Sequence, residues 1–200
     1  MSSSEPDVGL ESSALIVWDV QNGIAERAFN ITEIMPNVNK LIDAAHKSGR
    51  PVIASQHTGI PYEYLSKYGI YSARKRGMDP KAGTFMAEGS NEWKLMDELA
   101  LGDDDMVMKK HTPSFFVGTM LEQFLRNRGV DTIVLTGVST EAGIEGTARH
   151  AAALGFIPVV VEDAVGSFDK TRHDSALQLM RNMFPVKKTE EVIRSLGSLR

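Results

Sequence analysis

The stretch DTIVLTGVSTEAGIEGTARHAAALG, residues 131–155, has the pattern of a buried strand that turns directly into a helix. Asp131–Val138 is a short run of apolar and β-branched residues, as expected for a strand covered on both faces. Ser139 and Thr140 are residue types that begin helices, and Glu141–Leu154 is expected to be a helix that ends at a glycine. The stretch therefore predicts a βα unit, the building block of a parallel sheet.

Similar apolar runs and helix-like segments alternate on both sides of this unit. Further strands are expected at Ala14–Val20, Pro51–Ser55, Met106–Lys109 and Ile157–Val165, with a weaker one at Phe184–Lys188. Further helices are expected at Glu33–Lys47, Asn91–Leu101, Gly118–Asn127 and Lys170–Met183. Strands that alternate with helices predict an α/β protein, a three-layer α/β/α sandwich around a mainly parallel sheet.

The chain of 200 residues is long enough for one domain with a sizeable core. We expect a flexible tail over residues 1–12, which are rich in serine, and a single domain over residues 13–200. The segment Gln56–Gly89 is too long and irregular for a simple connection between strand and helix. It contains all four tyrosines, Tyr62, Tyr64, Tyr68 and Tyr71, which line a pocket, form a subunit interface or merely pack.

Composition excludes several classes of function. A net charge of −4 gives no basic surface for nucleic acid, and no apolar run approaches the roughly 20 residues of a membrane helix. The N-terminus lacks the pattern of a signal peptide, so a cytoplasmic protein is expected, with neither nucleic acid nor membrane as partner. The chain has no cysteine, which rules out disulfides, thiolate metal sites and a thiol nucleophile. The five histidines show no metal-binding spacing, and neither a metal nor a cofactor is expected.

Two of the expected strands end in residues suited to chemistry. The carboxyl ends of parallel strands form the usual ligand crevice, so polar side chains there are the first candidates. Asp19 ends a buried apolar run, where it either caps the next turn or carries out chemistry. Lys109 and Lys110 end another strand, and alternation sends one side chain toward solvent and the other into the crevice. The alternative is that both lysines are solvated.

Gly143 lies in the first turn of the helix that follows Val138. The free amides of such a turn form an anion or oxyanion site, and a glycine lets a ligand approach the backbone closely. The alternative is that Gly143 only relieves crowding between helix and sheet. The chain has no GxSxG elbow for a serine nucleophile, and no GxGxxG or phosphate loop for a nucleotide.

The stretches LIVWDVQNG, KHTPSFFVGT and TGVSTEAGIEGTARHA, in this order, resemble the isochorismatase-like hydrolase superfamily, which includes cysteine hydrolases such as nicotinamidase. The resemblance covers roughly residues 14–170 and is weakest over 56–89. It implies a six-stranded sheet of order 3-2-1-4-5-6, with the site between the first and fourth strands. It also implies a non-proline cis peptide between Val138 and Ser139.

The same resemblance assigns roles to individual residues. The family aspartate falls on Asp19, the family lysine on Lys110 and the nucleophilic cysteine on Gly143. Without a thiol the covalent route of the cysteine hydrolases is excluded. Isochorismatases also carry glycine there, and they hydrolyse a vinyl ether without covalent catalysis. The residues expected to bind substrate are Gln21, Asn22, Gln56, His57, Phe115, Val138, Ser139 and Thr140.

The leading hypothesis is a metal-independent hydrolase that acts on a small polar or anionic molecule without a covalent intermediate. Asp19 is then the general acid or base, Lys110 positions it and neutralises substrate charge, and Gly143 leaves room. Isochorismate is one candidate substrate. The alternatives are an amide hydrolase that uses Ser139, Thr140 or water, and a silent small-molecule binding protein. A homo-oligomer, dimer or tetramer, is expected from the resemblance. The hypothesis requires that Asp19 faces Lys110 and that no packed side chain fills the space beside Gly143.

Overall fold

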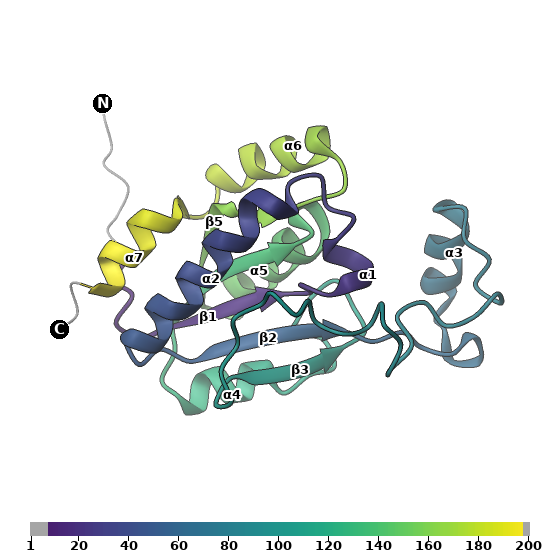
Figure 1. The fold of residues 1–200 in the computed structure, drawn as a ribbon, viewed down its shortest axis with the longest axis horizontal. Coiled ribbons are helices and arrows are strands. Elements are labelled where there is room, and N and C mark those ends of the chain that lie inside the picture. The colour runs from purple at the N-terminus through teal and green to yellow at the C-terminus, as the bar shows by residue number, and fades with distance from the viewer. Residues whose placement is uncertain (1–7, 198–200) are drawn as a thin grey trace.

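The computed structural model describes residues 8–197 and contains one six-stranded parallel sheet. The strands are β1 (Ser13–Trp18), β2 (Val52–His57), β3 (Met106–Lys110), β4 (Thr132–Val138), β5 (Ile157–Gly166) and β6 (Val186–Lys187). Their order in the sheet is β3-β2-β1-β4-β5-β6, as expected (Figure 1). The order places β1 at the centre, paired with β2 on one side and β4 on the other.

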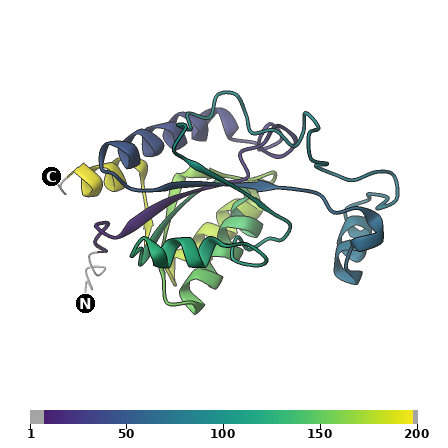
Figure 2. The same ribbon diagram turned by 90° about the horizontal axis from the view of Figure 1, so that it is seen from below.

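Helices cover both faces of the sheet, which confirms the three-layer sandwich (Figure 2). One face carries α2 (Ile31–Lys47) and α7 (Thr189–Gly197), and the short α1 (Asn22–Ala25) follows β1. The other face carries α4 (Leu121–Asn127), α5 (Glu145–Ala153) and α6 (Lys170–Arg181). The sequence did not predict α7, although Thr189 and the apolar spacing of Val192 and Leu196 are typical of a helix that packs on a core.

Alternation along β1 sends its side chains into two different core clusters. Leu15 and Val17 pack with residues of α2 and α7, whereas Ile16 and Trp18 pack with residues of α4, α5 and α6. All six residues of β1 are buried, which is why its sequence is a continuous apolar run. Trp18 is therefore the last side chain that β1 directs toward α5.

Two expected helices differ from the structure at their starts. Gly118 adopts φ 74°, in the left-handed region, and α4 begins only at Leu121. The segment expected as one helix from Glu141 instead begins with a π-helical turn over Thr140–Ile144, and α5 follows it. The turn places Gly143 against the carboxyl end of β1.

The expected helix Asn91–Leu101 is wrong, because this segment consists of turns and one isolated bridge to Gln21. Two of its carbonyl groups accept hydrogen bonds from backbone amides that follow β1. The backbone amides of Asn22 and Gly23 donate to the carbonyls of Lys94 and Glu92 at 3.0 and 2.9 Å. A helix would need those carbonyls for its own amides. Ser90 still accepts a bond from the Trp93 amide at 3.2 Å, as a helix cap does, but no helix follows.

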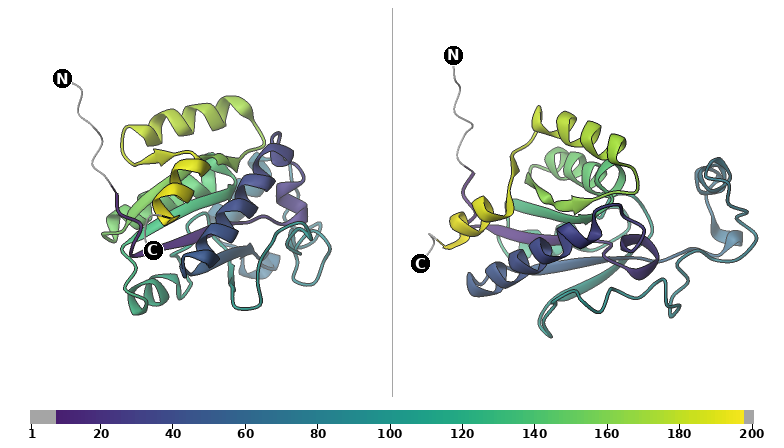
Figure 3. Two further views of the ribbon diagram at one scale, coloured as in Figure 1. Left: turned by 60° about the vertical axis from the view of Figure 1, so that its left-hand side comes forward. Right: turned by 45° about the horizontal axis from the view of Figure 1, so that its top comes forward.

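The irregular segment after β2 carries a short helix that lies apart from the three layers. It contains a 3-10 turn over Tyr62–Tyr64 and the helix α3 (Lys67–Lys75), neither of which was predicted. No residue of α3 is buried, and α3 stands away from the sheet in Figure 1 and in the right-hand view of Figure 3. Tyr64, Tyr68 and Tyr71 are among the most exposed large side chains of the described chain.

The tail expected over residues 1–12 lies partly outside the described residues, since residues 1–7 are not described. Of the described remainder, Leu10 is buried in the same cluster as α2, and its carbonyl accepts a bond from Ser13 Oγ at 2.8 Å, whereas Gly9 and Glu11 are exposed. Within residues 8–197, no helix combines the length and apolarity that a bilayer span requires.

Candidate active site

Asp19 and Lys110 form a buried ion pair at the carboxyl ends of β1 and β3. Lys110 Nζ lies 2.6 Å from Asp19 Oδ2, and both side chains are almost inaccessible to solvent. The strand between them contributes Ser55, whose Oγ donates to Asp19 Oδ1 at 2.6 Å and accepts from the Asp19 amide at 3.0 Å. Asp19 has φ 43°, a left-handed conformation that aspartate tolerates better than most residues, and the chain leaves the sheet there.

The two adjacent lysines point to opposite faces of the sheet, as alternation along the strand predicts. Lys110 is 2% exposed, whereas Lys109 points outward and pairs with Glu88 on the surface. Burial lowers the pKa of Lys110 below its ordinary value, and the Asp19 carboxylate opposes that change. Lys110 Nζ also lies 4.1 Å from the centroid of the Trp18 ring, where the aromatic face attracts a cation. The lysine thus has favourable contacts on two sides.

The space beside Gly143 is filled, which corrects the expectation that this glycine leaves room for a substrate. A Cβ atom at Gly143 would lie 1.8 Å from Trp18 Nε1 and 2.1 Å from Cε2, distances that no folded protein accepts. The glycine makes room for the indole ring. The requirement that Asp19 faces Lys110 is met, and the requirement for an open space beside Gly143 is not. No open space for a substrate therefore lies beside Gly143.

The backbone between β4 and α5 has the cis peptide that the family resemblance implied, between Val138 and Ser139. Val138 and Thr140 are both buried. The Thr140 hydroxyl donates to the Gly166 carbonyl at 2.9 Å and accepts from His173 Nδ1 at 2.8 Å. The O–H donor and one acceptor position of that hydroxyl are therefore occupied.

Three of the amides expected to bind substrate are engaged with the backbone. Gln21 is fully buried: its Oε1 accepts from the His57 amide at 2.7 Å, and its Nε2 donates to the carbonyls of His57 and Trp93. Gln56 also donates to the Trp93 carbonyl, at 3.1 Å, and Asn22 donates to the Asn91 carbonyl at the same distance. These contacts fix the turns around Asp19, so the three amides support the position of the pair.

His57, at the end of β2, is neutral at ordinary pH. Burial, together with the nearby charge of Lys110, lowers the pKa of His57 from 6.5 to about 4, and the Asp19 charge opposes this only in part. The charges of His111 and Arg76 act in the same direction as Lys110. An uncharged imidazole next to the buried pair can accept a hydrogen bond or a proton.

We expect the low pKa of His57 to make stability depend on pH in acid. In the unfolded chain this imidazole binds a proton below about pH 6.5, and in the folded chain only below about pH 4. The unfolded state thus gains protons first, so the free energy of unfolding falls as pH falls between these values. Urea unfolding across that range measures the slope, and His57→Gln should reduce it. An unchanged slope in the variant, with both proteins equal above pH 7, would contradict the assignment.

Sequence reasoning missed two residues that contact the pair. Ser55 was expected only as the end of a strand, and Trp18 only as an apolar strand residue. The sequence contains a feature that could have indicated each of them. Ser55 is a polar residue in a buried run, and alternation places Trp18 on the α5 side of the sheet. Phe115, which was expected in the site, is fully buried and contacts Trp18 edge to face at 5.8 Å between ring centroids.

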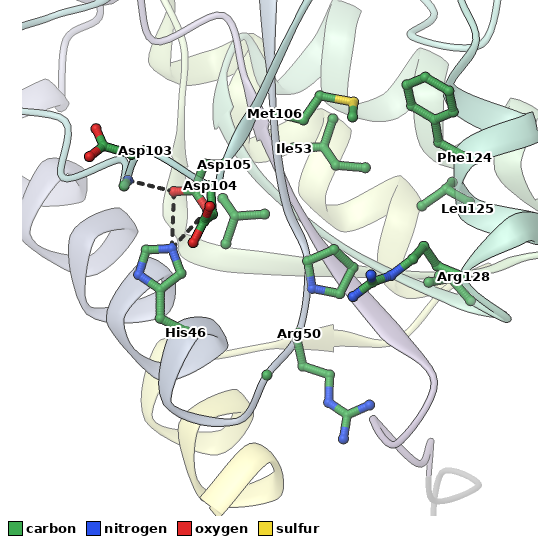
Figure 4. A pocket seen from close by; sticks show the side chains of 15 residues that line it. His46, Arg50, Ile53, Asp103, Asp104, Asp105, Met106, Phe124, Leu125 and Arg128 are labelled. Atoms are coloured by element: carbon green, nitrogen blue, oxygen red, sulfur yellow. Dashed lines mark hydrogen bonds and ion pairs between the residues drawn. The ribbon is translucent and has the colours of Figure 1, made fainter.

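A cavity of about 580 Å³ lies at the opposite end of the sheet, next to the starts of β2 and β3 (Figure 4). Arg50 and Arg128 line one side, and Asp103, Asp104 and Asp105 line another. His46 Nε2 pairs there with Asp105 at 2.8 Å. None of the residues of the Asp19 site lines this cavity. Over residues 8–197 no group of three or more histidine or acidic side chains is arranged to hold a metal ion.

Comparison with known proteins identifies the family. A family model, the Isochorismatase domain, matches residues 13–191. The uncharacterized isochorismatase family protein YecD of Escherichia coli O157:H7 is 32% identical over 195 residues, which cover 95% of this chain and 99% of YecD. Ureidoacrylate amidohydrolase RutB of Klebsiella pneumoniae is 31% identical over 173 residues, which cover 77% of this chain and 73% of RutB.

A solved cysteine hydrolase from Pseudomonas syringae pv. phaseolicola has the same fold, with a TM-score of 0.84, 23% identity and full coverage of both chains. The strand order, the extent of the family match and the similarity to YecD all agree. The protein is therefore a member of the isochorismatase family of hydrolases.

Proposed function

We propose that this hydrolase cleaves a small polar or anionic molecule through Asp19 and Lys110, without a metal and without a covalent intermediate. The observation that carries the proposal is the buried contact of 2.6 Å between Lys110 Nζ and Asp19 Oδ2 at the carboxyl edge of the sheet. Buried charges are costly unless paired, and a pair at a ligand crevice is typical of an active site. Gly143 then has a structural role, because it admits the Trp18 ring.

A vinyl ether of the isochorismatase type is the candidate substrate class. The one proton shared by the Asp19–Lys110 pair resides on Asp19 in the reacting state, and Asp19 delivers it to the methylene carbon of the vinyl ether, so the adjacent carbon becomes cationic. Water adds to that carbon and returns a proton to the Asp19 carboxylate, and the resulting hemiketal separates into a ketone and an alcohol. Lys110 holds the Asp19 carboxyl group in place and offsets the negative charge of the substrate.

A second candidate is hydrolysis of an amide by water that Asp19 activates. It is favoured by the similarity to RutB, which is named an ureidoacrylate amidohydrolase. A hydroxyl nucleophile is less well supported, because the Thr140 hydroxyl already makes two hydrogen bonds away from the site. Ser139 remains the side-chain alternative. A protein that binds its ligand without turnover is the third reading.

The test is a turnover screen of the purified protein with vinyl ethers, amides and small carboxylates, with and without a chelator. We expect ketone and alcohol from a vinyl ether, no ammonia from the amides, and the same rate with the chelator. Intact-mass measurements during turnover should show no ester adduct on the protein. Ammonia release would favour the amide hydrolase, and tight binding without any product would support the silent binding protein.

The expected homo-oligomer stays a proposal. It is supported by the exposed tyrosines Tyr64, Tyr68 and Tyr71 on and beside α3, which stands apart from the sandwich. Four cations and no acidic residue lie within residues 64–78, in a chain whose net charge is −4. A second copy of the chain offers the complementary negative charge.

The cytoplasmic location likewise stays a prediction.

A further inference from the structure

Three contacts fix the indole ring of Trp18 at the end of β1. Phe115 packs edge to face against it with an interplanar angle of 88°. Lys110 Nζ lies over the ring, and Gly143 lies against the five-membered part of the ring that contains Nε1. Trp18 is 2% exposed, so its orientation is set by packing.

Trp18 Nε1–H makes no hydrogen bond within residues 8–197, and it is not a fully buried donor, because the one fully buried side-chain nitrogen or oxygen without a partner in that range is Arg50 Nε. An indole N–H that reaches solvent bonds to water, or to a bound molecule that displaces the water. The other tryptophan of the chain has a partner in the protein: Trp93 Nε1 donates to Thr58 Oγ1 at 2.9 Å. The Trp18 donor is therefore available to a bound molecule next to the Asp19–Lys110 pair.

We propose that Trp18 is a specificity-determining residue, whose Nε1–H donates a hydrogen bond to an oxygen atom of the bound molecule. The proposal rests on the function proposed above and names the group that the site recognises. An indole N–H only donates, and Lys110 beside it is a cation. The two together favour a carboxylate or carbonyl oxygen and disfavour an amine or ammonium group at the same place.

Gly143 and Trp18 act as one steric unit in this arrangement. The ring atoms that a Cβ at Gly143 would meet are Nε1, Cε2 and Cδ1, at 1.8, 2.1 and 2.7 Å. They belong to a rigid ring held by Phe115, so they do not yield as the end of a flexible side chain would. A side chain at position 143 therefore requires a smaller residue at position 18.

The first test detects the donor itself. The chain has two tryptophans, so a ¹⁵N-labelled sample gives two indole N–H resonances, and Trp18→Phe identifies the Trp18 signal by its loss. Titration with pyruvate, a small carboxylate with a carbonyl group, should move the Trp18 resonance in a saturable way and leave Trp93 in place. Methylammonium should move neither. A Trp18 resonance that stays fixed at every pyruvate concentration would overturn the proposal.

Trp18→Phe keeps an aromatic ring beneath Lys110, and it removes the N–H donor together with part of the indole. We expect pyruvate to bind this variant about tenfold more weakly or worse, as a lost hydrogen bond to a charged group predicts. An unchanged affinity in the folded variant would show that the bound molecule does not use the N–H donor. If pyruvate shifts the Trp18 resonance but the protein turns over no substrate, the hydrogen bond from Trp18 is supported and the proposed hydrolysis is not. Failure of the one proposal can thus be distinguished from failure of the other.

The second test uses the absence of cysteine, since an introduced thiol is then the only one in the chain. Gly143→Cys should lower the urea midpoint strongly in the wild-type background and much less in Trp18→Val. The thiol of Trp18→Val/Gly143→Cys should react with iodoacetamide, with Ala152→Cys on the exposed side of α5 as the accessible control. If Gly143→Cys alone is as stable as the wild type, the Trp18 ring does not restrict the side chain at position 143.

Discussion

Asp19→Asn is expected to lower kcat/KM by about 10²–10⁴-fold, because it removes the carboxyl group that exchanges a proton. It also leaves Lys110 buried without its counter-charge, so some stability is lost and turnover is compared on folded protein. The asparagine side chain has the same shape as the carboxyl group. Its oxygen can still accept from Ser55 or Lys110, which donate to the two carboxylate oxygens of the wild type. The measurement is steady-state turnover of the substrate found in the screen, together with circular dichroism.

Glu88→Gln is the matched control, because Glu88 pairs with Lys109 on the surface, one residue before Lys110. This variant should retain wild-type turnover. Wild-type activity in Asp19→Asn would remove Asp19 from the reaction and with it the proposed mechanism. A variant that fails to fold would be replaced by Asp19→Ser, which leaves space for water.

Lys110→Ala is expected to lower the free energy of unfolding by about 3–5 kcal/mol and to abolish turnover, because it leaves the Asp19 carboxylate buried and unpaired. The same substitution at Lys109 should cost about 0–1 kcal/mol, as for other exposed pairs. Urea unfolding of the two single variants, measured side by side, gives the difference directly.

The double variant Asp19→Asn/Lys110→Met separates stability from catalysis. It removes both charges and fills the space with a flexible apolar side chain, so we expect stability close to that of the wild type and no turnover. Equal losses in Lys110→Ala and Lys109→Ala would show that the pair is not a buried charge pair in solution.

The strands β1, β2, β4 and β5 were predictable because each is largely a buried apolar run, whereas β3 is mostly exposed. The choice between Lys109 and Lys110 followed from alternation in β3 and from the family resemblance. The order of the strands came from the resemblance alone. Composition and spacing do not encode which strands adjoin, and β1 has partners from both halves of the chain.

The segment Asn91–Leu101 shows where local pattern fails. It has a Ser90 cap and helix-like spacing, but its carbonyls bond to amides near Asp19 that are about seventy residues away in sequence. The partnership of Trp18 with Gly143 was hidden for a similar reason. The pattern fixes the side of the sheet to which Trp18 points, and only the packing of α5 on that side shows what the ring meets.

The central place of β1 in the sheet has a consequence for how the chain is made. Leu15 pairs with Val52 on one side and with Val134 on the other, so the second partner leaves the ribosome long after the first. Until β4 has been synthesised, the apolar run Ser13–Trp18 has one unpaired edge that can associate with other chains. Contacts between such distant segments also slow folding. Association through the first strand is therefore most favoured in the interval between the synthesis of β2 and that of β4.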